Sequence, residues 1–160
     1  MGRFARWQAT RLRRHYAGGR GDAFARRAAR FYAALHGTWL TPRRWVTLEV
    51  PGRRTGNPTR FPLGMADVDG HWYLVSMLGE CAWVRNVRAA DGHAVLRHGR
   101  ARPVRLVEVP VAERAPMIRR LVQVAPGARP HVRVDRAEAV AAFEAVAADH
   151  PVFRVLPATP

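Results

Sequence analysis

The chain has 160 residues, 48% of them hydrophobic, so it can bury one core but is short for two domains. Its 27 basic residues, all arginine, outnumber 12 acidic residues and give a formal net charge of +15. This excess of positive charge indicates an anionic partner: phosphate, a polyanionic cofactor, nucleic acid or a membrane surface. The single cysteine, Cys81, excludes an intramolecular disulfide and a cysteine-rich metal site.

The first 40 residues are predicted to form a basic helical segment in two pieces. The second piece starts at a good N-cap, Asp22, and stops at Gly37. Its apolar residues recur on one helical face: Phe24, Ala28, Phe31 and Leu35. We expect residues 1–40 either to pack on the domain or to lie on an anionic membrane. No apolar secretion signal follows the first arginines, so a cytoplasmic protein, at most peripheral to the membrane, is expected.

After this segment the apolar residues alternate along the chain, which is typical of strands. Turn signals at Asp69-Gly70 and at Gly99 predict two hairpins, with a short helix between them. Further helices are predicted over residues 111–124 and 135–147, and the last strand lies within "HPVFRVL". This order predicts an α+β domain over residues 41–160, with about six antiparallel strands rolled into a small barrel and helices beside it.

Resident catalytic groups are scarce in the sequence. The seven histidines are scattered without metal-ligand spacing, so no metal site is expected. Ser76 lacks a nucleophile-elbow motif, and neither a Gly-rich dinucleotide loop nor a Walker loop occurs. No helix-turn-helix, RNA-binding signature or zinc finger is present, so no specific nucleic-acid partner is expected. A basic protein without reactive groups of its own indicates that a bound cofactor carries the chemistry.

The stretch "GRRTGNPTRFPL", residues 52–63, gathers Arg53, Arg54 and Arg60 in one turn with few acids nearby. Guanidinium groups match the shape and charge of phosphate or carboxylate, and the glycines let backbone N–H groups approach a ligand. The turn is therefore predicted to hold an anion. The alternative is a hairpin whose arginines are simply solvated.

Three stretches follow one another at a characteristic spacing: "GRRTGNPTRFPL", "DGHWYLVSMLGE" and "AWVRNVRAADGHAVLRHGR". Together they resemble the deazaflavin-dependent nitroreductase and quinone reductase family, which are small split β-barrel oxidoreductases that use coenzyme F420. The resemblance runs from about Thr47 to Leu156. It implies a split-barrel fold and F420 as the cofactor.

The resemblance also implies which residues contact the coenzyme. Its phosphate and glutamyl tail would be held by Arg53, Arg54, Thr55 and Gly56, with Arg60 nearby. Its tricyclic ring would lie beside Pro62 and Leu63. The pyrimidine edge of the ring would meet the backbone of Ser76, Met77, Leu78 and Gly79. The short helix that closes the pocket would contribute Trp83 and Asn86, although Trp83 could instead be an ordinary core aromatic.

Two departures from the family's pattern limit this transfer. Many relatives carry an arginine directly after the turn's proline, where this chain has Thr59; Arg60, one residue later, faces the opposite side of a strand. Relatives also place tyrosines in the loop before the last helix, whereas this chain has none after Tyr73. His131 in that loop is a candidate proton donor, because histidine exchanges protons near neutral pH. The alternative is an exposed loop histidine.

The expected function is hydride transfer from reduced F420 to a small organic acceptor, such as a quinone, a nitro compound or an activated enone. Two alternatives stay open. One is a split-barrel enzyme that uses FMN, and the other is a non-enzymatic protein that binds deazaflavin or another polyanion. The protein is expected to be a monomer or a homodimer.

Overall fold

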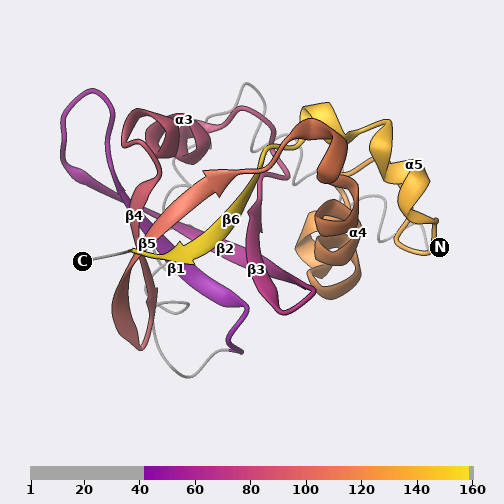
Figure 1. Ribbon diagram of the computed structural model, residues 1–160, viewed down its shortest axis with the longest axis horizontal. Helices are drawn as coiled ribbons and strands as arrows, with labels where there is room; N and C mark the ends of the chain where they lie inside the picture. Colours follow the sequence, from indigo (N-terminus) through magenta and orange to yellow (C-terminus); the bar gives the residue numbers. More distant parts are fainter. Residues whose placement is uncertain (1–41, 159–160) are drawn as a thin grey trace.

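The computed structural model describes residues 42–158, so the expected basic segment of residues 1–40 lies outside the described residues (Figure 1). The strands are β1 (Trp45–Pro51), β2 (Pro58–Val68), β3 (His71–Val75), β4 (His93–His98), β5 (Arg100–Glu108) and β6 (Val152–Pro157). The α-helices are α3 (Ala82–Ala89), α4 (Ala115–Val124) and α5 (Val140–Glu144). Single 3-10 turns are η2 (Val111–Glu113), η3 (Pro126–Ala128) and η4 (Ala147–Asp149).

The strands form one closed barrel in the order β1-β2-β3-β6-β5-β4, in which β4 returns to pair with β1. Every pair of neighbours is antiparallel. The β2–β3 hairpin turns at Asp69 and Gly70, whose φ values of 48° and 75° suit a two-residue turn that matches the strand twist. The β4–β5 hairpin turns at Gly99, with φ 70°. The predicted α+β class, the antiparallel barrel and both hairpins are confirmed.

Alternate residues of the strands fill the inside of the barrel, as the period of two requires. On β1 these are Val46, Leu48 and Val50, and all three are buried. The same core cluster contains residues of the other strands and of α3: Met65, Leu74, Trp83, Val84, Val87, Ala94, Leu96, Val104, Leu106 and Phe153. Helix α3 therefore contributes its apolar face to the barrel core, from the segment between β3 and β4.

A second core lies between the outer face of the barrel and α4. Helix α4 buries Ile118, Leu121 and Val122, which belong to one cluster with outward residues of β2, β3 and β6. Phe143 of α5 is completely buried in the same cluster. In Figure 1, α4 and α5 accordingly lie together on one side of the barrel, while α3 lies apart from them.

The predicted helix over residues 135–147 is wrong in its length, because only Val140–Glu144 is α-helical. Asp135 does not start a helix there; its carboxylate accepts a hydrogen bond from the Ala137 N–H, at 2.9 Å, within a turn. Residues 135–141 are exposed, so little apolar packing supports a first helical turn. The helix predicted over residues 111–124 begins as a 3-10 turn and becomes α-helical at Ala115.

Candidate active site

The arginine-bearing turn, residues 52–57, is closed by its own backbone. The Gly52 N–H donates to the Asn57 carbonyl at 2.8 Å, and the Gly56 N–H donates to the Gly52 carbonyl at 2.7 Å. Gly56 has φ 70°, a conformation that glycine adopts without strain. Residues 53–57 are exposed, so this hydrogen-bonded turn places the side chains of Arg53, Arg54 and Thr55 in solvent.

Asn86 of α3 fixes this turn to the barrel. Its Oδ1 accepts hydrogen bonds from Arg53 Nη1 at 3.1 Å and from the Arg53 N–H at 3.4 Å. Its Nδ2 donates to Thr59 Oγ1 at 3.1 Å, and the Thr59 hydroxyl donates to the Val50 carbonyl at 2.8 Å. Asn86 is 4% exposed, so these bonds satisfy a buried amide and hold the Arg53 guanidinium in place.

No carboxylate of the described residues forms an ion pair with Arg53 or Arg54. The nearby carboxylate of Glu49 is already taken, by Arg97 Nε at 3.0 Å and by Arg60 Nε at 2.7 Å. These two arginines, Arg97 more strongly, lower the pKa of Glu49 and keep it ionised. The turn therefore keeps two uncompensated positive charges, whereas Arg60 is held by an acid; its proposed contact with coenzyme stays a prediction.

The loop between β3 and α3, residues 76–81, is anchored at Ser76 by hydrogen bonds to the residues directly before β6. The Ser76 N–H donates to the Pro151 carbonyl at 2.8 Å, and the Ser76 carbonyl accepts from His150 Nδ1 at 2.9 Å. The Ser76 hydroxyl donates to the Gly79 carbonyl at 2.6 Å. The backbone polar groups of Ser76 are thus used within the protein, which leaves ligand contacts to the residues that follow.

Three consecutive backbone N–H groups in this loop, those of Met77, Leu78 and Gly79, donate to no group of the described residues. Gly79 has φ 65°, and a Cβ there would lie 3.2 Å from the Asp149 carbonyl oxygen. Adjacent free N–H groups in a turn make a donor site for carbonyl or anionic oxygens. The loop therefore offers donors to an acceptor-rich ring edge, and the contact of its backbone with the coenzyme stays a prediction.

The predicted ring-contacting side chains lie on different faces. Leu63 is partly buried and packs on the barrel core, whereas its neighbour Pro62 projects from the opposite face of β2. Trp83 is 5% exposed, and its ring centroid lies 5.5 Å from that of Phe153 at a tilt of 60°. Trp83 thus serves the barrel core, and Pro62 and Leu63 do not form one surface.

His131, the candidate proton donor, lies in the loop between η3 and α5. It is half-buried, and its backbone N–H donates to the Ala128 carbonyl at 3.0 Å. Sequence reasoning missed two residues that hold the site, Thr59 and His150. For Thr59 the signal in the sequence is its departure from the family's pattern, because it stands where many relatives carry an arginine; its role in the hydrogen bonds to Asn86 and Val50 is not predicted by that pattern.

Within residues 42–158 no group of three or more histidine, cysteine, aspartate or glutamate side chains could hold a metal ion. In the same part of the chain, no helix has the length and apolar character needed to cross a bilayer.

The available donors fit the coenzyme that the resemblance implies. F420 carries a polyanionic phosphate and glutamate tail, which suits the two uncompensated guanidinium groups of Arg53 and Arg54. Its pyrimidine ring edge carries carbonyl oxygens, which suit the free N–H groups of Met77, Leu78 and Gly79. Asn86 on α3 links the turn directly to the helix that follows this loop.

Comparison with one solved structure supports the fold, and two others match less closely. A protein of unknown function from Agrobacterium tumefaciens superposes with a TM-score of 0.52 and 15% identity, over 77% of this chain and 52% of the other. An F420-H2 dependent reductase, FDR-A, shows a TM-score of 0.48 and 22% identity, over 71% of this chain and 94% of the other. A structure described as a domain-swapped dimer has a TM-score of 0.49 and 17% identity, over 82% and 96%.

No curated protein matches the sequence significantly. The model of the F420H(2)-dependent quinone reductase family, in contrast, matches residues 24–145, which is most of the chain. This range contains the arginine-bearing turn, the loop of free N–H groups and helix α3. The chain therefore belongs to the F420H2-dependent quinone reductase family and is an oxidoreductase that uses coenzyme F420.

Proposed function

We propose that the protein catalyses hydride transfer from reduced F420 to a small organic acceptor, with a quinone as the first candidate and nitro compounds or activated enones as others. One observation carries the proposal. Two uncompensated arginines lie on a rigid turn, and Asn86 binds that turn to α3. Helix α3 in turn follows directly after the loop of free N–H groups. The family match supports F420 chemistry, and its description names quinones as acceptors.

The protein's own contribution would be binding and orientation. Arg53 and Arg54 would hold the anionic tail, with Thr55 and Gly56 completing the turn around it. The N–H groups of residues 77–79 would fix the ring edge through hydrogen bonds. The deazaflavin, when bound, supplies the hydride. His131 is proposed as the group that protonates the acceptor.

A binding titration tests the placement of the coenzyme. Purified full-length protein is titrated with F420 and, separately, with FMN, and tryptophan fluorescence is followed. The Arg53→Ala, Arg54→Ala double variant is expected to weaken F420 binding at least about tenfold, because two charge-assisted contacts are lost. The control is Arg133→Ala, Arg136→Ala, which removes the same charge from two exposed positions before α5.

Equal weakening in both double variants would show that net charge, not the turn, governs affinity. Binding of FMN in preference to F420 would favour the FMN alternative. Tight F420 binding without turnover of any quinone, nitro compound or enone would favour the non-enzymatic alternative.

We also propose that residues 1–40 bring the enzyme to anionic membranes, where quinones dissolve. The support is their basic, amphipathic sequence. In a flotation experiment, the full chain should float with vesicles that contain phosphatidylglycerol at low salt and less so at moderate salt. Absence of flotation at low salt would contradict the proposal.

A further inference from the structure

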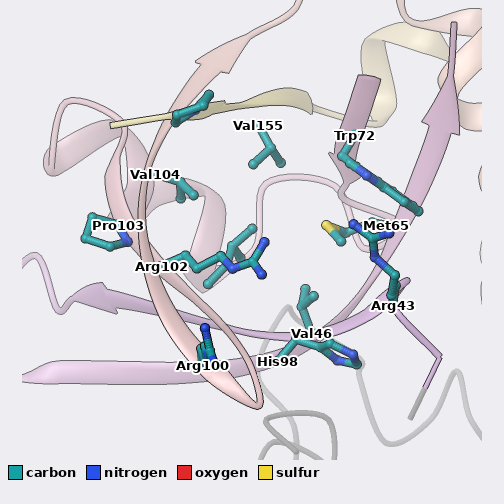
Figure 2. A pocket seen from close by; sticks show the side chains of 12 residues that line it. Arg43, Val46, Met65, Trp72, His98, Arg100, Arg102, Pro103, Val104 and Val155 are labelled. Atoms are coloured by element: carbon teal, nitrogen blue, oxygen red, sulfur yellow. The ribbon is translucent and has the colours of Figure 1, made fainter. Parts of the chain in front are cut away.

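A cavity of about 490 Å³ opens at the end of the barrel where β1 begins. Its walls are apolar side chains, one from each of the six strands: Val46, Met65, Trp72, Leu96, Val104 and Val155. Figure 2 shows Val46, Met65, Trp72, Val104 and Val155 arranged around a common space. A cavity of this size, with apolar walls in the mouth of a barrel, is typical of a small-molecule site.

This cavity is separate from the arginine-bearing turn and from the loop of free N–H groups. Val46, in its wall, stands near the start of β1, whereas the arginine-bearing turn begins at Gly52, after the end of that strand. At about 3.3 Å per residue, the strand places the two roughly 20 Å apart. Neither the turn nor the loop of residues 77–79 contributes to the cavity wall. The cavity is thus distinct from the groups proposed to hold the tail and the pyrimidine edge of F420, and its nearest approach to the predicted ring contacts is at Leu63, which pairs with Val46 across β1 and β2.

Three arginines, Arg43, Arg100 and Arg102, surround the mouth of the cavity. All three are exposed, and within residues 42–158 no carboxylate pairs with any of them. In Figure 2 the Arg102 side chain extends toward the centre of the cavity, and Arg43 and Arg100 lie on different sides of it. Like charges at one mouth repel one another, so an anion bound between them would be stabilised.

His98 adds a fourth polar group to this mouth. Its Nδ1–H donates to the Trp45 carbonyl at 3.1 Å, because a carbonyl oxygen can only accept. The ring is thereby oriented, and Nε2 is the nitrogen that remains for a ligand. The mouth therefore combines the positive charge of three arginines with the oriented imidazole ring of His98, and the cavity behind it is apolar.

We propose that this cavity is a second ligand site, and that it binds an anionic amphiphile. The apolar body of the ligand would occupy the chamber, and its single acidic group, a carboxylate, sulfate or phosphate, would lie among Arg43, Arg100 and Arg102. The apolar walls contribute affinity through burial, and the guanidinium groups select for the acidic group.

The test compares an acid with its uncharged counterpart. Full-length protein is titrated calorimetrically with decanoate and with decanol, below their aggregation concentrations. Decanoate should bind with one-to-one stoichiometry, and octanoate should bind more weakly by about fourfold for each methylene removed. Decanoate should also change the fluorescence of Trp72, and Trp72→Phe should remove that change while binding is kept.

Arginine variants locate the acidic group. Arg100→Gln, Arg102→Gln should weaken decanoate at least about tenfold and change decanol by less than about twofold. The matched control, Arg133→Gln, Arg136→Gln, should leave decanoate binding unchanged. Val155→Phe, which fills the cavity, should weaken the binding of both decanoate and decanol. Far-UV circular dichroism checks that this variant folds. If it does not fold, the Arg100→Gln, Arg102→Gln variant still tests the proposal, because both arginines are exposed.

Several results would overturn the proposal. These are no saturable binding of decanoate, equal affinity for decanoate and decanol, or equal weakening in the two arginine pairs. Displacement of F420 by decanoate would also overturn it, because the two sites would then overlap. Association with phosphatidylglycerol vesicles in the absence of decanoate binding would assign the charged mouth to a membrane surface instead.

Discussion

Asn86 is the residue on which the arginine-bearing turn depends. It is buried, accepts two hydrogen bonds from Arg53 and donates one to Thr59. Removing a buried partner leaves the others unsatisfied, which costs more than the bonds themselves contribute. At the scale of single residues, the site is therefore held by one amide rather than by the charged groups that would touch the coenzyme.

Asn86→Ala should lower the free energy of unfolding by about 1–3 kcal/mol and weaken F420 binding, because Arg53 loses its fixed orientation. Urea denaturation measures the first effect and fluorescence titration the second. Asn57→Ala is the control, since Asn57 is exposed in the same turn; its effect should stay within about 0.5 kcal/mol. Unchanged F420 affinity in Asn86→Ala would remove the positioning role.

The residue scale also shows what sequence reasoning can and cannot predict. The turn itself was predictable, because adjacent arginines and glycines carry a local signal. The contact between Arg53 and Asn86 joins residues 33 apart, and that between Ser76 and His150 joins residues 74 apart. No local pattern encodes such pairs, because they arise only when the barrel brings separate elements together. Trp83 illustrates the same limit, since an apolar helix position does not say which core it fills.

At the scale of elements, hairpins and short turns set the geometry of the barrel. Gly92, which joins α3 to β4, has φ 77°, and a Cβ there would clash with the Leu106 carbonyl oxygen. Gly70, in the β2–β3 turn, has φ 75° but open space around it. Both glycines therefore have a backbone conformation that strains other residues, but only at Gly92 would a side chain also meet a steric clash.

Gly70→Ala should destabilise the protein by about 1 kcal/mol, from backbone strain alone. Gly92→Ala should cost a further 1–3 kcal/mol or so, because β5 must move to make room. Thermal and urea denaturation of the two variants measure the difference. Equal losses of stability in the two variants would show that β5 moves away from the new Cβ of Gly92→Ala without a free-energy cost.

A cluster of charges joins α3, β5 and the start of α4. Glu108 accepts from Arg88 Nε at 2.7 Å and from Arg114 Nη2 at 2.9 Å. Its pKa is lowered, chiefly by the hydrogen bond from Arg88, with a smaller contribution from Arg114. A carboxyl group whose pKa is lower in the folded state adds stability above its unfolded pKa of about 4.3, and this stability is lost as pH falls through the folded pKa.

Glu108→Gln should therefore lower stability at neutral pH and flatten the loss of stability on acidification below about pH 4.5. Urea denaturation over a series of pH values measures both effects. Glu113→Gln, a change at an exposed acid in η2, is the control and should follow the wild-type profile. A wild-type pH profile in Glu108→Gln would contradict the assignment.

At the scale of the whole molecule, the net charge of +15 should govern how the coenzyme arrives. Salt screens long-range attraction over about 10 Å at 0.1 M. F420 affinity should fall as salt is raised, mainly through slower association, in stopped-flow measurements. A deazaflavin ring without the anionic tail is the control and should show little dependence on salt. Equal salt dependence for F420 and for the ring without its tail would show that the net charge of the protein does not act through the anionic tail of the coenzyme.

The fold class was predictable at this scale because alternating apolar residues and hairpin signals recur along the chain. Hairpins β2–β3 and β4–β5 pair neighbours in sequence, so local turn residues specify them. The predicted helix over residues 135–147 is shorter than expected because residues 135–141 are exposed and have no apolar surface to pack on, whereas Phe143 is buried. Neither the cavity at the barrel end nor its arginine mouth could be predicted from the sequence, since its lining comes from all six strands.

The place of β6 in the barrel has a consequence for synthesis on the ribosome. This strand is made last of the six, yet it lies between β3 and β5 and pairs with both. Until residues 152–157 leave the exit tunnel, a nascent chain that has formed the other five strands exposes two unpaired sheet edges. Such edges recruit other strands, so this interval is when the protein is most exposed to misassembly and when a chaperone would protect it most.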